Sequence, residues 1–173
     1  MYEVSLLAIA LVPMLLETAR SAANERRLRA AGAVEPADDV IRIMQLAYPA
    51  CFVAMIVEAW WRGSSWSHAA TAGAIVFACA KALKYWAIAT LGERWTFRVL
   101  VPPRSQRIVR GPYVWLRHPN YIAVAGEIIG FAVVAGAPLT GTLAAAGFGV
   151  LMLMRIKVEE RALQHSEFSN QNW

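Results

Sequence analysis

The stretch from Gly111 to Tyr121 gathers polar residues that can do chemistry between two long apolar runs. It reads Gly-Pro-Tyr-Val-Trp-Leu-Arg-His-Pro-Asn-Tyr and contains one of the chain's 3 histidines. Proline suits the first turn of a helix, so we expect a helix to begin near Pro119. The free N–H groups and positive dipole end of that helix suit an anionic ligand group, with His118 and Asn120 beside it. A capped helix start with an interfacial Tyr121 explains the same residues equally well.

Arg155 and Glu159 follow the last apolar run. They are four residues apart and therefore share one face of a helix. They either form an ion pair along that helix, worth about a few tenths of a kcal/mol, or turn together toward a ligand.

Glu127 falls about two turns into an apolar run, at the depth of a membrane. A carboxylate is costly there, so we expect it to face a cavity or a charged partner. Lys81 and Lys84, one helical turn apart in an earlier apolar run, are candidate partners, and so is a bound cation. For the lysines themselves, we favour an arrangement in which their ammonium groups extend toward the membrane surface over a catalytic role.

The composition predicts a membrane protein. Of the 173 residues, 58% are hydrophobic and only 17% are charged, whereas soluble domains are about 45–50% apolar and about 25% charged. The net charge of +5 is clustered between apolar runs, as membrane topology requires, so we expect no nucleic-acid partner. Cys51 and Cys79 lie in apolar runs, and no Cys/His spacing suits zinc, so no metal site is expected.

Five apolar segments predict an all-α integral membrane protein with about five transmembrane helices, because a spanning helix needs about 20 apolar residues. The segments cover residues 2–19, 40–61, 68–90, 121–135 and 139–154, of which the last two are short. Residues 21–31 are expected to be helical and interfacial, and the tail from Arg155 is expected to continue as a helix. We expect a single domain over 1–173, with three N-terminal helices in 1–90 and the functional loop, helical hairpin and tail motif in 91–163.

The basic residues predict the topology. They fall in three polar segments, 20–42, 94–117 and 155–161, which five helices would place on one side of the membrane. The positive-inside rule makes that side cytoplasmic and puts the N-terminus outside.

Several motifs, taken in order, give the chain a resemblance to a known family. They are Leu91–Thr96, Gly111–Tyr113, Arg117–Tyr121, and Arg155 followed by Glu159, Glu160 and Leu163. Over residues 90–163 the chain resembles the isoprenylcysteine carboxyl methyltransferase family, a membrane family that uses S-adenosylmethionine and releases S-adenosylhomocysteine. It is most similar to the bacterial branch associated with polyketide synthases, whose members O-methylate long-chain phenolic or pyrone lipids.

The resemblance implies a cytoplasmic cofactor-binding loop and a C-terminal helix that forms the other wall of the cofactor site. It assigns cofactor binding to Gln106, Arg107, Ile108, Tyr113, His118, Pro119, Asn120, Tyr121 and Glu159. It places Arg155 at the methyl acceptor as a catalytic residue. A hydroxyl acceptor must lose a proton, for which Glu127 or His118 is the candidate base.

The expected function is S-adenosylmethionine-dependent methyl transfer to a lipophilic acceptor in a bacterial inner membrane. An isoprenylcysteine-type carboxylate, a long-chain phenolic or pyrone hydroxyl, and a membrane lipid with an amine are all compatible acceptors. The alternatives are a non-enzymatic membrane scaffold and a membrane reductase with a nicotinamide cofactor. The sequence has no glycine-rich phosphate-binding loop that would support the reductase, but the arginine-rich loop keeps the reductase as an alternative.

Overall fold

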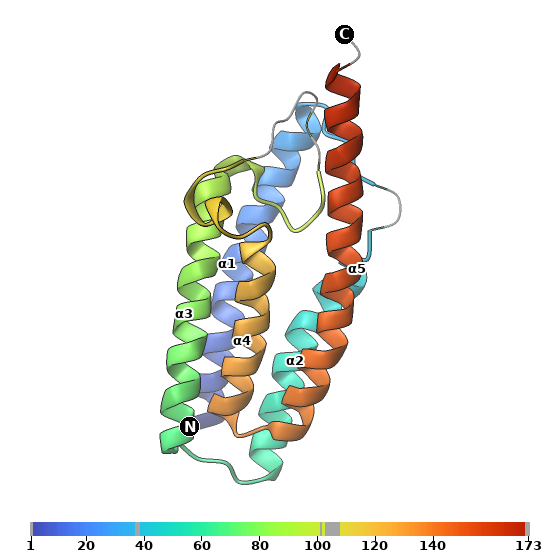
Figure 1. Ribbon diagram of the computed structural model, residues 1–173. Helices are drawn as coiled ribbons and strands as arrows, with labels where there is room; N and C mark the ends of the chain where they lie inside the picture. Colours follow the sequence, from blue (N-terminus) through green and yellow to red (C-terminus); the bar gives the residue numbers. More distant parts are fainter. Residues whose placement is uncertain (1, 37–38, 101, 103–107, 172–173) are drawn as a thin grey trace.

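The computed structural model describes residues 2–36, 39–100, 102 and 108–171, and it describes side chains as far as residue 161. Five α-helices run up and down in alternation, so the two chain ends lie at opposite ends of the bundle (Figure 1). The helices are α1 (Tyr2–Ala30), α2 (Ile41–Trp61), α3 (His68–Leu91), α4 (Pro119–Ala135) and α5 (Pro138–Gln171). Two short 3₁₀ helices, η1 (Gly92–Arg94) and η2 (Gly111–Val114), lie in the connection between α3 and α4.

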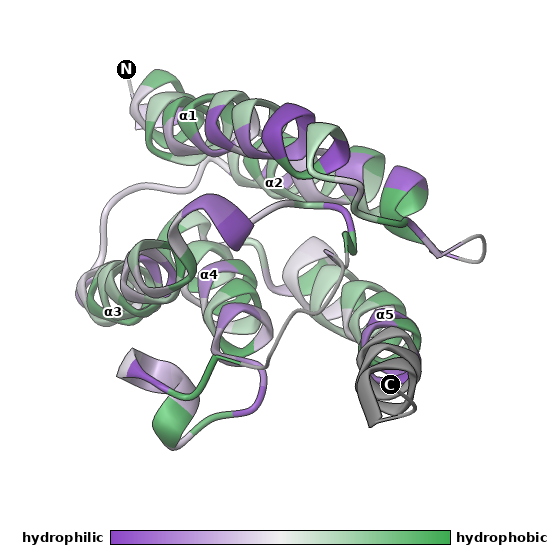
Figure 2. Cartoon of the chain, turned by 90° about the horizontal axis from the view of Figure 1, so that it is seen from above, coloured by the Kyte–Doolittle hydropathy of each residue, from purple (hydrophilic) through white to green (hydrophobic). Residues whose placement is uncertain are grey.

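The helices confirm the predicted all-α membrane architecture. Of the described helices, 4 are long and apolar enough to cross a membrane, and α4 is a shorter apolar helix of 17 residues. At 1.5 Å per residue α4 measures about 25 Å, slightly less than the hydrocarbon core of about 30 Å. Viewed from above, α1 and α2 lie on one side and α4 lies between α3 and α5 on the other (Figure 2).

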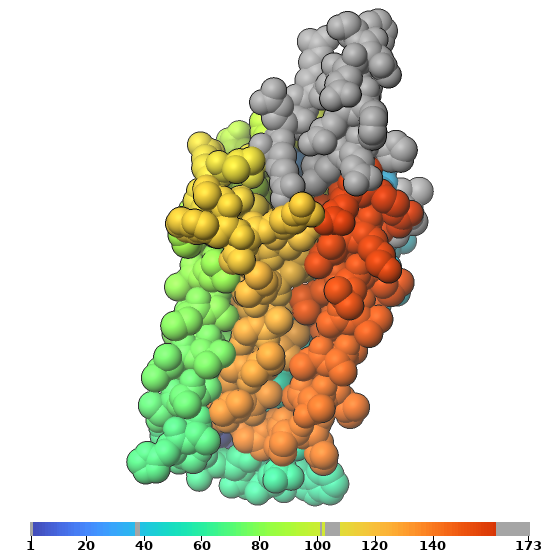
Figure 3. Space-filling view, viewed as in Figure 1, coloured from blue at the N-terminus to red at the C-terminus, as the bar shows by residue number. Residues whose placement is uncertain are grey.

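The three basic segments lie at the same end of the bundle, as the sequence predicts. The end of α1, the connection between α3 and α4, and the C-terminal half of α5 all gather at the top of Figure 1. The space-filling view shows the connection before α4 covering the tops of α3 and α4 beside α5 (Figure 3). The polar residues of interest are therefore brought to one end of an apolar bundle.

Helices α3 and α4 pack unusually closely because glycines face each other across the contact. A Cβ atom on Gly130 would lie 2.7 Å from the backbone nitrogen of Phe77, and one on Gly73 would lie 2.8 Å from the carbonyl oxygen of Gly130. A Cβ on Gly126 would lie 2.9 Å from the Cβ of Ala80. These distances exclude any larger side chain without a backbone shift, so the two helices form a fixed pair.

The polar residues 21–30, predicted to be helical, continue the first apolar span as one helix. Helix α1 runs without interruption from Tyr2 to Ala30, past an internal Pro13. Its polar residues have tertiary partners: the Ser21 hydroxyl accepts from the backbone N–H of Phe97 at 2.8 Å. The Asn24 amide donates to the carbonyl oxygen of Trp95, also at 2.8 Å. These contacts hold the connection between α3 and α4 against the C-terminal part of α1.

Candidate functional site

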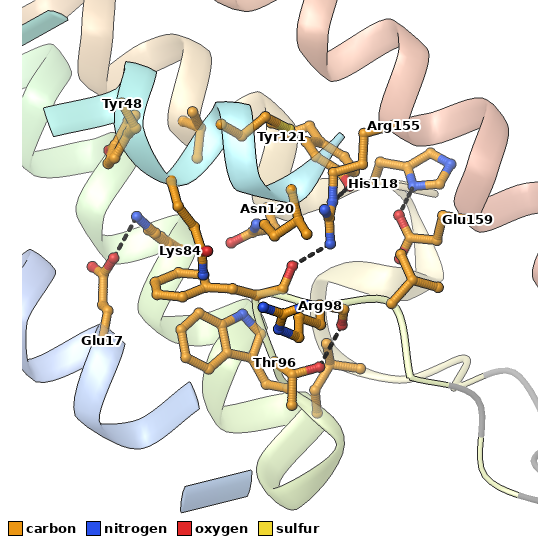
Figure 4. A pocket seen from close by; sticks show the side chains of 18 of the residues that line it. Glu17, Tyr48, Lys84, Thr96, Arg98, His118, Asn120, Tyr121, Arg155 and Glu159 are labelled. Carbon is orange, nitrogen blue, oxygen red and sulfur yellow. Dashed lines mark hydrogen bonds and ion pairs between the residues drawn. The ribbon is translucent and has the colours of Figure 1, made fainter. Parts of the chain in front are cut away.

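A cavity of about 910 Å³ opens at the end of the bundle where the polar segments gather. Side chains of all five α-helices line it together with the connection between α3 and α4 (Figure 4). Its deeper wall is largely apolar and includes Leu11, Met14, Leu15, Met44, Pro49, Val124 and Phe148. The cavity thus joins a polar end to an apolar one.

His118 joins the start of α4 to the C-terminal helix. It is the residue that precedes Pro119 at the start of α4, as the sequence predicts. Its Nδ1 lies 3.6 Å from Oε2 of Glu159, and its Nε2 lies 3.3 Å from Oε1 of Glu160. The close approach of Glu159 and then the hydrogen bond to Glu160 raise the pKa of His118 above its ordinary value, against the opposing effect of burial. The two carboxylates therefore stabilise the protonated form of the imidazole.

Two oxygens at the polar end of the cavity are unsatisfied. Within the described part of the chain, Asn120 Oδ1 and Glu159 Oε2 are buried without a hydrogen-bond partner, and both residues line the cavity. Buried polar atoms nearly always have a partner, so these two oxygens are ready to accept from donors of a ligand. Tyr113 lies nearby on η2, and burial, followed by the charge of Glu159, raises the pKa of its phenol. Tyr113 therefore stays protonated and can donate.

Arg155 on α5 is held from three sides. Its Nη1 donates to Oδ1 of Asp39 at 2.7 Å, and its Nε donates to the Tyr121 hydroxyl at 3.0 Å. Its Nη2 donates to the carbonyl oxygen of Phe97. Arg155 is only 5% exposed, yet it lines the cavity. Arg155 therefore forms its ion pair with Asp39. Glu159, the alternative partner on the same helix, lies beside His118.

Glu127 belongs to a buried charged cluster. Its Oε2 lies 3.1 Å from Nζ of Lys81 and 3.4 Å from Nζ of Lys84, and it accepts a hydrogen bond from the Tyr48 hydroxyl. Glu17 pairs with the same two lysines, at 3.2 Å from Lys81 and 2.6 Å from Lys84. The favoured interpretation, in which the lysines extend to the membrane surface, is wrong because both are buried. The alternative, in which they are partners of Glu127, is confirmed.

The structure brings most of the predicted site residues to the same cavity. Among the residues that line it are Ile108, Tyr113, His118, Asn120, Tyr121, Arg155 and Glu159. Pro119 is buried in the first turn of α4, and Glu127 lies behind the cavity wall formed by Tyr48 and Lys84. The other two predicted residues, Gln106 and Arg107, lie outside the described residues.

Several residues of the site were not predicted: Glu17, Asp39, Tyr48, Arg98 and Glu160. Glu17 carried a signal, because a carboxylate in an apolar run of α1 needs a buried partner. Asp39 and Arg98 lie in polar connections, where nothing in the sequence distinguishes them from solvated charges. Arg98 pairs with Glu35 at 2.6 Å and so fixes the segment that follows η1.

Comparison with known proteins agrees with this arrangement. The profile of the isoprenylcysteine carboxyl methyltransferase (ICMT) family matches residues 73–165, which include α4, η2 and the described part of α5 that faces the cavity. The chain belongs to this family. The chain is also 30% identical to the uncharacterized protein YpbQ of Bacillus subtilis, over 92% of this chain and 95% of that protein. An uncharacterized protein of Haemophilus influenzae is 27% identical over 82% of this chain and 83% of its own length. No solved structure matches the chain.

Membership of the ICMT family makes the protein a membrane methyltransferase. Methyltransferases of this family use S-adenosylmethionine, and the polar end of the cavity suits that group chemically. The cofactor carries an amino group and ribose hydroxyls, which are donors, and the unsatisfied oxygens of Asn120 and Glu159 are acceptors.

Proposed function

We propose that this ICMT-family protein binds S-adenosylmethionine at the polar end of the cavity and methylates a lipophilic acceptor held at the apolar end. The observation that carries the proposal is the single cavity of about 910 Å³. Unsatisfied acceptors lie at its polar end, and hydrophobic residues of α1, α2 and α5 form its deeper wall. A water-soluble donor and a membrane-borne acceptor can therefore meet within one space.

The residues proposed to hold the cofactor lie on α4, α5 and the connection before them. Glu159 and Asn120 accept from its donors, Tyr113 donates, and protonated His118 keeps Glu159 in place. The resemblance adds Gln106, Arg107, Ile108, Pro119 and Tyr121. When bound, the cofactor supplies an electrophilic methyl group on a sulfonium.

The chain's own contribution is alignment and exclusion of water. In-line displacement requires the acceptor oxygen to lie opposite the leaving sulfur, which a rigid pocket can impose. Arg155 is proposed to orient the acceptor, because its guanidinium lines the cavity and is itself fixed by Asp39 and Tyr121. The acceptor is proposed to be an isoprenylcysteine-type carboxylate or a long-chain phenolic or pyrone hydroxyl.

The proposed location is the bacterial inner membrane, with the cavity on the cytoplasmic side and the N-terminus outside. Support comes from the three basic segments at one end of the bundle, to which the positive-inside rule applies. S-adenosylmethionine is a cytosolic compound, so this orientation also gives the site access to it.

Equilibrium binding of S-adenosylhomocysteine to the detergent-purified protein tests the proposal. We expect Glu159→Ala to weaken binding by about tenfold to a hundredfold, since a hydrogen bond to a charged group contributes about 1.5–3 kcal/mol. His118→Ala is expected to weaken it less, because His118 acts through Glu159. The exposed Glu93 on η1, which pairs with Arg27, provides the matched control Glu93→Ala.

The opposite results identify the alternatives. Absence of S-adenosylhomocysteine binding, with no effect of Glu159→Ala, would contradict the proposal and favour a scaffold. Thermal stabilisation by NADPH in its place would favour the reductase.

A further inference from the structure

The buried cluster of Glu17, Tyr48, Lys81, Lys84 and Glu127 has no part in the proposed cofactor site. Glu127 is 0% exposed and Lys84 is 2% exposed. Removing charges from water costs several kcal/mol per ion, and a buried ion pair is often no more stabilising than packed hydrophobic residues. Charged residues at membrane depth are accordingly rare and mark functional sites. The cluster therefore calls for a functional explanation.

The charges of the cluster balance. Two carboxylates face two ammonium groups, and each lysine lies within 3.4 Å of both glutamates. A proton added to this neutral group would leave it with one net positive charge. That charge would stabilise an anion formed in the adjoining cavity, because Coulomb interactions are strong where water is excluded.

Tyr48 connects the cluster to the cavity. Its side chain lines the cavity, and its hydroxyl donates to Oε2 of Glu127, which lies behind it. The Lys84 ammonium lies 5.1 Å from the centre of the Tyr48 ring. Because a phenolic oxygen also accepts hydrogen bonds, Tyr48 can receive one from a group in the cavity while donating to Glu127.

Glu127 is the buried carboxylate to which Tyr48 donates. Within the described part of the chain, its Oε1 is buried without a hydrogen-bond partner, while Oε2 receives Tyr48 and both lysines. Tyr48 and Glu127 thus form a path of two hydrogen-bonding groups from the cavity to a buried carboxylate. Asn120, at the polar end, lines the same cavity as Tyr48 and Lys84 (Figure 4).

We propose that Tyr48 is a catalytic residue for the phenolic or enolic hydroxyl acceptor named above, and that it accepts the proton of that acceptor and passes its own to Glu127. This inference rests on the proposed methyltransferase function. The acceptor O–H bond breaks as its oxygen bonds to the methyl carbon of the sulfonium donor, and the carbon–sulfur pair stays on sulfur as a thioether. The acceptor proton moves to Tyr48, the Tyr48 proton moves to Glu127, and one proton leaves to solvent after turnover.

A carboxylate acceptor would make this path unnecessary. A carboxylate is already ionised at neutral pH and needs no base, whereas general-base catalysis matters for a hydroxyl. Arg155 also already pairs with Asp39 at 2.7 Å, so a carboxylate acceptor beside Arg155 would be repelled by the charge of Asp39. A neutral hydroxyl can approach Arg155 without this repulsion.

Tyr48→Phe tests the proposal with two acceptor probes in detergent micelles. One is a long-chain alkylphenol, and the other is the same phenol carrying nitro groups, which is ionised at neutral pH. We expect Tyr48→Phe to lower kcat on the plain phenol about a hundredfold at neutral pH, the usual scale of general-base catalysis. The loss of kcat on the plain phenol should become smaller as the pH rises toward the pKa of the free phenol. The Tyr48→Phe variant should methylate the nitrophenol at nearly the wild-type rate.

Tyr85→Phe is the matched control, because Tyr85 lies 6.0 Å from the Lys81 ammonium on the exposed side of α3. It should leave both rates unchanged. An equal loss on both phenols would show a structural role for Tyr48 and overturn the proposal. So would methylation of an S-farnesylcysteine carboxylate with no methylation of the alkylphenol. In either case, if the wild-type protein binds S-adenosylhomocysteine, the proposed methyltransferase function stands although the role of Tyr48 does not. If the wild-type protein does not bind S-adenosylhomocysteine, the proposed function is itself wrong.

Discussion

Arg155 on α5 and Asp39, just before α2, form an ion pair of 2.7 Å although 116 residues separate them in the chain. Oδ1 of Asp39 also accepts from the backbone N–H of Ile41 at 3.1 Å, so this carboxylate caps the start of α2 and holds Arg155 at once. Both side chains are nearly fully buried. The pair therefore fixes a guanidinium in the cavity wall and joins α2 to α5.

Arg155→Ala should remove methyl transfer while leaving most of the cofactor affinity. The guanidinium is proposed to orient the acceptor, and loss of orientation can cost about a hundredfold or more in rate. Turnover with labelled S-adenosylmethionine and extracted bacterial lipids, compared with S-adenosylhomocysteine binding, separates the two effects. Arg161→Ala, on the exposed surface of the same helix, is the control. If Arg155→Ala instead loses cofactor affinity and keeps turnover, the assigned roles of Arg155 and Glu159 are wrong.

His118 should give the folded protein a pH-dependent stability. Its pKa is raised by Glu159 and then by Glu160, so the contribution of protonated His118 is complete below the unfolded pKa of about 6.5. The contribution is lost as the pH rises through the raised pKa of the folded state. We therefore expect the melting temperature of the wild type to exceed that of His118→Gln near pH 6, with the difference closing in alkaline buffer.

His68→Gln is the control for this experiment, because His68 is exposed at the start of α3, at the opposite end of the bundle. It should give a difference from the wild type that does not change with pH. If the difference in melting temperature between His118→Gln and the wild type is also the same at every pH, the pairing of a charged His118 with Glu159 and Glu160 is contradicted.

The sequence predicts the helices well because apolar run length and helix-breaking residues are local properties. The start of α4 at Pro119, the span of α2 and the helical continuation into α5 all follow from such signals. The partners of Ser21 and Asn24 do not, because they lie 76 and 71 residues away in the chain. Local polarity distinguishes these two residues from the apolar span but does not indicate what they contact.

The candidate site could be predicted only in part, for a similar reason. The residues on α4 and α5 form motifs of short spacing, so the resemblance finds them in the sequence. Asp39 precedes α2 and Tyr48 lies on it, and only the packing of α2 against α5 and α4 brings Asp39 to Arg155 and Tyr48 to the cavity. The lysine pair shows the same limit, because an ammonium group in an apolar run is compatible both with the membrane surface and with a buried glutamate.

Glu127→Gln should slow methylation of a hydroxyl acceptor at neutral pH and recover part of the rate at high pH. Glutamine keeps the size of the side chain but cannot take up the acceptor's proton, so the acceptor must ionise in solution first. Glu58→Gln provides a matched buried carboxylate, which caps the start of α5 through Thr140 at the other end of the bundle. Rates are compared per folded protein across pH 6–10. An unchanged rate for Glu127→Gln would rule out its part in proton transfer.

Gly130→Ala should destabilise the protein, because the added Cβ would lie 2.7 Å from a backbone nitrogen of α3, which cannot move aside as a side chain can. Overpacking of this kind costs about 1–3 kcal/mol. Gly147→Ala is the matched control, since a Cβ there has nothing within 4 Å. A helical glycine replaced by alanine in open space gains up to about 1 kcal/mol. Opposite shifts of the melting temperature in detergent are therefore expected for the two variants, and a stabilising Gly130→Ala would contradict the close contact of α3 and α4.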